Sequence, residues 1–133
     1  LTPHPAELAR LCGVTVGEVM SDRLGSAYRL SEKYGVTVLA KSADTFAVDG
    51  GKVYLCTEGT TTLAKGGSGD MLAGIVSSYV AQGCDALDAA ALGSFTLGST
   101  ALLAGYKRSE RGIIARDVID ALPRFLYDLE NAE

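Results

Sequence analysis

The stretch Leu63-Ala64-Lys65-Gly66-Gly67-Ser68-Gly69-Asp70-Met71-Leu72-Ala73-Gly74 organises the interpretation of this chain. Its three glycines in four positions disfavour helix and strand, because each glycine costs roughly 0.5–1 kcal/mol there relative to alanine. From Met71 to about Gln82 the apolar residues recur at helical spacing. We therefore expect a glycine-rich loop that opens directly into a helix. Such a junction presents backbone N–H groups and the positive end of the helix dipole, which suit an anion such as a phosphate.

Asp70 follows the last of these glycines and has two interpretations. Aspartate is an ordinary residue for the N-cap or first turn of a helix. In the other interpretation, the carboxylate stands beside a bound phosphate and accepts a proton from an attacking hydroxyl. The residue type alone leaves both interpretations open.

The segment Ala64–Gly74 resembles the phosphate-binding loop of the ribokinase-like superfamily. Within that superfamily, its sequence is most similar to that of the ADP- or ATP-dependent NAD(P)H-hydrate dehydratases. The resemblance implies an α/β fold, a ribokinase-like layered sheet with flanking helices. It also implies that Asp70 contacts the hydrated nicotinamide substrate and serves as the catalytic base. By the same resemblance, the nucleotide phosphates are expected on four loop residues: Gly66, Gly67, Ser68 and Gly69.

The N-terminal segment Leu1–Glu7 carries a second part of this resemblance. Its prolines predict an extended start and then a helix to about Leu11, with His4 near the helix cap. The segment is similar to the family's His-Pro-x-Glu element, which implies that His4 binds the hydrated nicotinamide. Glu7 matches the glutamate that orders metal and phosphate in related kinases, so an indirect role toward Mg²⁺ is implied for it. The His-Pro dipeptide at this place favours a dehydratase over a kinase.

The segment Val36–Ala40 is β-branched and apolar, which is typical of a buried parallel strand. A hairpin is predicted farther on, pairing Thr45–Val48 with Lys52–Cys56 across Asp49-Gly50-Gly51. Between these elements lies a stretch similar to the family's Lys-Gly-Ala-Asp-Thr element, with serine in place of the usual glycine. The resemblance implies that the adenylate part of the nucleotide lies against five residues: Lys41, Ser42, Ala43, Asp44 and Thr45.

Two features before the glycines have alternative interpretations. Thr60-Thr61-Thr62 stands where the family commonly has Asn-Pro-Gly. These hydroxyls are either donors to a phosphate or ordinary solvated groups. Lys65 either supplies local positive charge to the loop or is an ordinary exposed lysine.

Further helices are expected at several places along the chain. Asp22–Tyr34 predicts an amphipathic helix ended by Gly35, and a final helix is expected from Asp117 to about Leu129. Asp85 or Asp88 is expected to cap a small-residue helix that continues to about Gly105. Part of that helix, 89–106, is 18 residues without a charge, the lower limit for a membrane span. Its small residues favour a helix packed inside a soluble core instead.

Composition narrows the classes of protein to consider. A length of 133 residues with 47% hydrophobic content fits one domain with a buried core. The net charge of −4 argues against a nucleic-acid partner. Cys12, Cys56 and Cys84 are odd in number and widely spaced, so reduced thiols are expected rather than disulfides or zinc. Nothing resembles a signal peptide, and we expect a cytoplasmic protein without a membrane partner.

By resemblance, the reaction is the ADP- or ATP-dependent dehydration of NADHX or NADPHX to NAD(P)H, with Mg²⁺ on the nucleotide. The ribokinase-like domain is considerably longer than this chain, which begins with Leu1 rather than Met. Residues 1–133 are therefore expected to be its C-terminal nucleotide-binding portion, with the N-terminal half of the fold absent. Exposed strand edges are then expected to make the chain a homo-oligomer. Two alternatives remain: a sugar or vitamin kinase of the same fold, and a truncated non-catalytic nucleotide-binding module.

Overall fold

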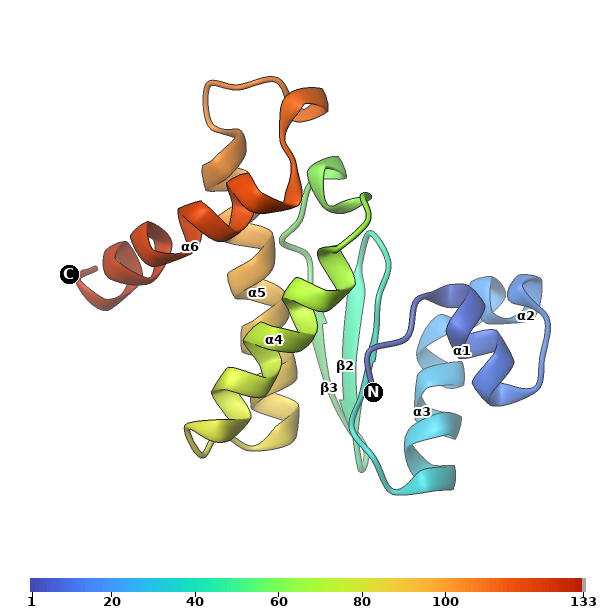
Figure 1. Cartoon of the computed structure of the whole chain (residues 1–133). Helices are drawn as coiled ribbons and strands as arrows, with labels where there is room; N and C mark the ends of the chain where they lie inside the picture. Colours follow the sequence, from blue (N-terminus) through green and yellow to red (C-terminus); the bar gives the residue numbers. More distant parts are fainter. Residues whose placement is uncertain (133) are drawn as a thin grey trace.

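A three-stranded antiparallel sheet lies near the centre of the computed structural model, which describes residues 1–132 (Figure 1). β1 (Val38–Ala40) pairs with β2 (Thr45–Asp49), and β2 pairs with β3 (Lys52–Cys56). Gly50 and Gly51 connect β2 to β3 with positive φ angles of 47° and 87°, which glycine adopts without steric cost. The predicted hairpin is confirmed.

The expected parallel strand at Val36–Ala40 is wrong for this sheet, because β1 runs antiparallel to β2. Parallel pairing occurs instead on the other side of β1. The N–H of Leu39 donates to the carbonyl of Leu1 (2.7 Å), and the N–H of Lys41 donates to the carbonyl of Pro3 (2.9 Å). All three residues of β1 are buried, so an apolar run does not distinguish a parallel from an antiparallel neighbour.

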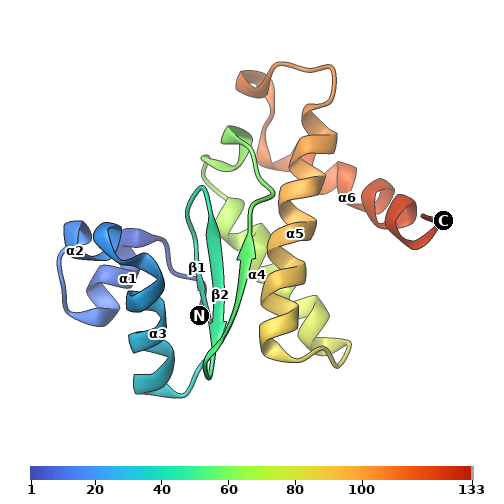
Figure 2. The ribbon, with the colours of Figure 1, turned by 180° about the vertical axis from the view of Figure 1, so that it is seen from behind.

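Three helices cover one face of the sheet (Figures 1 and 2). They are α1 (Pro5–Cys12), α2 (Val16–Ser21) and α3 (Arg23–Tyr34). The strands turn alternate residues toward this layer, as a pleated strand must. A single apolar cluster results, containing Leu8, Ala9, Val19, Ala27, Leu30, Val38, Ala40 and Val48.

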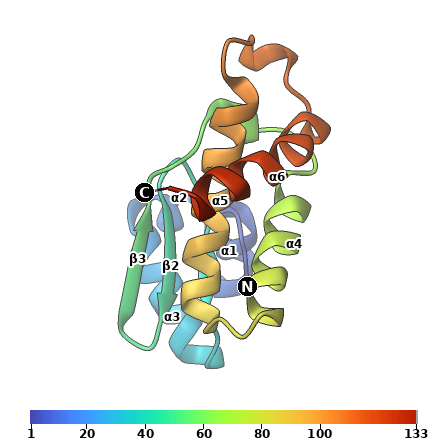
Figure 3. The ribbon, with the colours of Figure 1, turned by 90° about the vertical axis from the view of Figure 1, so that its left-hand side faces the viewer.

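The other face of the sheet is covered by α4 (Ser68–Ala81) and α5 (Ala86–Gly105). Figure 3 shows α6 (Ala115–Glu130) crossing α5, and Figure 1 shows its end extending away from the sheet. Leu39 and Ala47 point from the strands into this second layer. There they join a cluster with Leu72, Leu87, Ala90, Leu97, Ala101, Ala104, Ile113 and Val118.

α5 is the helix whose length and composition would also suit a membrane span. It contacts α4, α6 and all three strands, so it packs as the central helix of this layer. Small residues allow the close contacts: a Cβ on Gly98 would lie 2.5 Å from the carbonyl oxygen of Glu58, and one on Gly93 would lie 2.4 Å from Cγ2 of Val76. Its N-cap is Asp85, whose carboxylate accepts the N–H of Leu87 (2.9 Å).

The predicted helix boundaries agree with the structure except at two N-termini. α3 ends at Gly35, which has φ 61°. α4 begins at Ser68 rather than Met71, and α6 begins at Ala115 rather than Asp117. In α4, the left-handed Gly67 sets the boundary, so Ser68 and Gly69 already belong to the first turn despite the glycine content.

Candidate functional site

One end of the sheet collects most of the residues singled out in the sequence. Ala40 lies opposite Phe46, and Thr45 lies opposite Cys56. The end of β1, the start of β2 and the end of β3 therefore share this end of the sheet. The parallel pairing of the N-terminal segment along β1 delivers His4 to the same place.

The glycine-rich loop forms an open N-terminus for α4. Gly67 is the N-cap residue, with φ 93° and ψ −16°, and α4 has no side-chain cap. The first helical hydrogen bond runs from the N–H of Met71 to the carbonyl of Gly67 (3.0 Å). Within residues 1–132, the N–H groups of Gly66, Gly67, Gly69 and Asp70 have no hydrogen-bond partner. Free donors at the positive end of a helix are the arrangement that binds phosphates.

Asp70 is exposed at the third residue of α4. It does not cap the helix, since α4 has no side-chain cap hydrogen bond. Its carboxylate also makes no ion pair with the part of the chain that the structure describes. Asp70 is therefore free to contact a molecule bound at the loop.

Lys41, at the end of β1, extends to the start of α4. A Cβ placed on Gly69 would lie 3.4 Å from Nζ of Lys41. The same Nζ is 3.9 Å from Oε2 of Glu7, and Nε2 of His4 is 3.3 Å from Oε1 of Glu7. We call His4, Glu7 and Lys41 the site cluster. It places a histidine, a carboxylate and an ammonium group beside the glycine loop.

Glu7 and His4 are held by the capping box of α1. Nδ1 of His4 accepts the N–H of Glu7 (3.2 Å), and Oε2 of Glu7 accepts the N–H of His4 (2.8 Å). This backbone hydrogen bond lowers the pKa of Glu7, so its carboxylate is charged near neutral pH. Residues 1–132 contain no group of three His, Cys, Asp or Glu side chains that could hold a metal ion. A Mg²⁺ ion here would need nucleotide oxygens among its ligands.

The segment 42–45 forms the turn between β1 and β2. Thr45 donates its hydroxyl to the carbonyl of Ser42 (3.2 Å). Arg23 donates to the carbonyl of Asp44 (2.8 Å) and lies 3.9 Å from its carboxylate. Ser42, Ala43 and Asp44 are exposed. The contacts of Arg23 attach the turn to α3. The turn lies at the same end of the sheet as Lys41, and of these residues it is Lys41 that reaches the glycine loop.

The residues before the glycine loop bind a segment that the sequence did not single out. Glu110 accepts hydrogen bonds from the hydroxyls of Thr60 (3.1 Å) and Thr61. Lys65 donates through Nζ to the carbonyls of Glu110 (2.8 Å) and Ile113. Thr60 and Thr61 thus donate to a carboxylate of this chain, a contact that neither interpretation of the threonines included. Glu110 lies 49 residues from Thr61 in the chain, so no local pattern could have identified the pairing.

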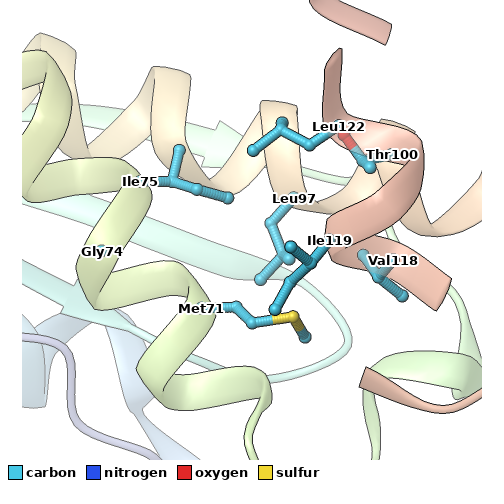
Figure 4. Close-up of a pocket in the computed structure, with 8 residues that line it drawn as sticks. All are labelled: Met71, Gly74, Ile75, Leu97, Thr100, Val118, Ile119 and Leu122. Atoms are coloured by element: carbon cyan, nitrogen blue, oxygen red, sulfur yellow. The ribbon is translucent and has the colours of Figure 1, made fainter. Parts of the chain in front are cut away.

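A cavity of about 200 Å³ lies beside the start of α4, between α4, α5 and α6 (Figure 4). Met71, Leu97 and Ile119 are among its lining residues, which are apolar apart from Thr100. Within residues 1–132, the buried hydroxyl of Thr100 has no hydrogen-bond partner. The cavity offers a nucleotide phosphate no charged group, so it lies outside the polar site.

Comparison with known proteins shows which sequences and folds this chain resembles. The family model described as NAD(P)H-hydrate dehydratase matches residues 1–124. The bifunctional NAD(P)H-hydrate repair enzyme Nnr of Vibrio cholerae is 39% identical over 126 residues, which are 95% of this chain and 26% of that protein. The ADP-dependent (S)-NAD(P)H-hydrate dehydratase of Neisseria meningitidis is 41% identical over 102 residues, which are 76% of this chain and 34% of that protein.

A solved structure shares the fold. The ADP/ATP-dependent NAD(P)H-hydrate dehydratase from Bacillus subtilis, co-crystallised with ATP and Mg²⁺, superposes with a TM-score of 0.89 at 30% identity. The superposition covers 96% of this chain and 46% of that one. The α/β fold class is confirmed, and this chain spans about half of the solved structure and a smaller share of the two relatives. Since the family model matches nearly all of its residues, the chain belongs to the NAD(P)H-hydrate dehydratase family.

Proposed function

We propose that this chain carries the nucleotide-binding side of an enzyme that dehydrates NADHX or NADPHX to NAD(P)H with ADP or ATP. The observation that carries the proposal is the set of free N–H groups of Gly66, Gly67, Gly69 and Asp70, with Nζ of Lys41 beside Gly69. Fixed donors and a cation in one place suit phosphate groups. Family membership supplies the substrate class.

The proposed chemistry joins two steps around a nucleotide phosphoryl group. The hydroxyl oxygen of the hydrated dihydropyridine ring attacks the terminal phosphorus, the bond to the nucleotide's bridging oxygen breaks, and the hydroxyl proton passes to Asp70. The resulting ester then loses phosphate as its C–O bond breaks. A proton leaves the adjacent ring carbon, and the double bond of NAD(P)H returns. The nucleotide loses one phosphate overall. The ring loses its phosphorylated hydroxyl and a proton in an elimination, which leaves its overall oxidation level unchanged, so no oxidant or reductant is needed.

Each residue has a task in this proposal. The N–H groups of Gly66–Gly69 stabilise negative charge that grows on the transferred phosphoryl. Lys41 neutralises part of the nucleotide charge, with its adenylate near 41–45, and His4 binds the substrate ring. Glu7 would be the indirect partner of a Mg²⁺ ion bound with the nucleotide, and the ion would reduce the negative charge of the phosphate groups.

Two further expectations belong to the proposal. A cytoplasmic location is supported by the three cysteines Cys12, Cys56 and Cys84, which are all free thiols in this fold. The kinase alternative loses support because the matching family is a dehydratase. The non-catalytic alternative concerns this chain by itself and is decided by assay.

The test is to incubate the chain with NADHX and either ADP or ATP and to follow the absorbance of NADH. We expect NADH to form only when protein and nucleotide are both present. A sample without nucleotide and a sample with Asp70→Asn protein serve as controls. Nucleotide binding without NADH formation would leave the non-catalytic alternative, and the absence of both would overturn the proposal.

A further inference from the structure

The connection between α5 and α6, residues 106–114, is fixed firmly enough to serve as an anchor. Ile113 is only 2% exposed and belongs to the apolar cluster of the second layer. Asp117 accepts the N–H of Ile114 (2.9 Å), and Arg108 lies 3.2 Å from the Asp117 carboxylate. The connection is thus held by the core and by the first turn of α6.

The segment leading into the glycine loop is attached to this anchor by four hydrogen bonds. Glu110 binds the hydroxyls of Thr60 and Thr61, and Lys65 binds two carbonyls of the connection. We call Thr60, Thr61, Lys65 and Glu110 the Glu110 clamp. Directly after the anchor, the first residue of α6 approaches the loop itself, since a Cβ on Gly67 would lie 3.5 Å from the Cβ of Ala115. The anchor therefore contacts the entry to the loop, and the start of α6 lies beside its left-handed residue.

The contacts of the clamp use charged groups, which make stronger hydrogen bonds than neutral ones. The hydroxyls of Thr61 and Thr60 lower the pKa of Glu110, so its carboxylate is charged near neutral pH. The ammonium group of Lys65 is directed to backbone carbonyls of the connection. Lys65 immediately precedes Gly66, so holding its side chain also restricts the first glycine of the loop.

The loop has little else to hold it. Three of its residues are glycines, which lose more conformational freedom on ordering than other residues. The N–H groups that face a ligand make no bonds within residues 1–132 that would fix them. We propose, on the basis of the proposed function, that Glu110 and Lys65 are positioning residues that hold Gly66–Gly69 in the geometry that receives the nucleotide phosphates.

The test compares Glu110→Ala and Glu110→Gln with Glu32→Ala, a matched change at an exposed glutamate of α3. Two quantities are measured: amide hydrogen exchange at Ser68 and Met71, the hydrogen-bonded amides of the loop, without nucleotide, and ADP affinity by calorimetry. In Glu110→Ala we expect exchange at Ser68 and Met71 and the Kd for ADP each to rise about tenfold, because charged hydrogen bonds are lost. Glu110→Gln keeps one acceptor oxygen and should recover part of both effects. Glu32→Ala should match the wild type.

A double-mutant cycle tests whether the carboxylate acts through the hydroxyls. Thr61→Val removes one hydroxyl with little change of shape. If Glu110 works through Thr61, adding Thr61→Val to Glu110→Ala should change exchange and affinity little further, because the two residues share one interaction. Full additivity would overturn the assignment of that pair.

The outcomes separate this inference from the proposed function. Unchanged exchange at Ser68 and Met71 in Glu110→Ala overturns the positioning role, whatever happens to ADP affinity. Faster exchange with unchanged ADP affinity also overturns it, since the clamp would then not set the binding geometry. Faster exchange in a chain whose wild type binds no nucleotide would support the hold on the loop and count against the proposed function.

Discussion

The site cluster and the Glu110 clamp each contain a glutamate and a lysine beside the same loop, yet their contacts differ. In the site cluster, Glu7 and Lys41 are 3.9 Å apart, and the ammonium group of Lys41 faces Gly69. In the clamp, Lys65 donates to two backbone carbonyls, and Glu110 accepts from two hydroxyls. The charged groups of Glu110 and Lys65 use their hydrogen bonds within the chain and so support the loop. The ammonium group of Lys41 keeps donors available, which can bind a ligand.

The largest expected effect is the loss of turnover on substitution of Asp70. This residue belongs neither to the site cluster nor to the Glu110 clamp. Asp70→Asn keeps the size and shape of the side chain but loses the proton acceptor. Turnover should fall by roughly 10²–10⁴-fold if the carboxylate acts as a general base, while nucleotide affinity holds or rises. Steady-state rates and melting temperatures measure the two effects.

The control is Asp70→Ala, which separates catalysis from stability. A capping role would cost about 1 kcal/mol of unfolding free energy in the alanine variant. Because α4 has no side-chain cap, we expect little loss of stability in either variant. Near-normal turnover in Asp70→Asn would remove the catalytic role.

Gly67 comes next, because it shapes the loop that both groups flank. Valine at φ 93° is strained, and its side chain would disturb the space beside the free N–H groups. Calorimetry should give an ADP affinity lower by about tenfold or more, with strain of roughly 1–2 kcal/mol in stability. Gly74→Ala, in the exposed middle of α4, is the control and should bind ADP normally. Unchanged affinity in Gly67→Val would show that the loop assignment is wrong.

The two lysines test the comparison itself. Lys41→Ala should weaken ADP binding several-fold without changing the melting temperature, because its ammonium group has only a long, partly exposed ion pair to lose. Lys65→Ala should lower the unfolding free energy by about 1 kcal/mol, because two carbonyls lose their donor. Its ADP affinity should also fall. A larger loss of melting temperature in Lys41→Ala than in Lys65→Ala would reverse the roles given to the two groups.

Self-association of the chain is the smallest of the expected effects. It concerns the edge strand β3 rather than the glycine loop. β3 is the outer strand of the three-stranded sheet, and Val53, Tyr54 and Leu55 on it are 42%, 46% and 58% exposed. An exposed apolar edge strand favours pairing between chains. Sedimentation should therefore reveal oligomers at high concentration, and Leu55→Lys should reduce them. A clean monomer in the wild type would contradict this expectation.

The sequence predicted features whose causes are local. The cap at His4, the end of α3 at Gly35 and the turn at Gly50 and Gly51 each depend on backbone preferences of a few residues. The antiparallel pairing of β1 was missed, because an apolar strand buried on both faces carries no sign of its neighbour's direction. The Glu110 clamp was missed because it joins residues that are distant in the chain. Long-range hydrogen bonds leave no periodicity in a single sequence.

The most direct test of the account is to locate the nucleotide by NMR on the isotopically labelled chain. On addition of ADP, the amide signals of Gly66, Gly67, Gly69 and Asp70 should shift most, followed by the Lys41 side chain. Inorganic phosphate should move the same loop signals with lower affinity. Shifts confined to other surfaces, or none at the loop at saturating ADP, would contradict the claim that this glycine loop binds the nucleotide phosphates.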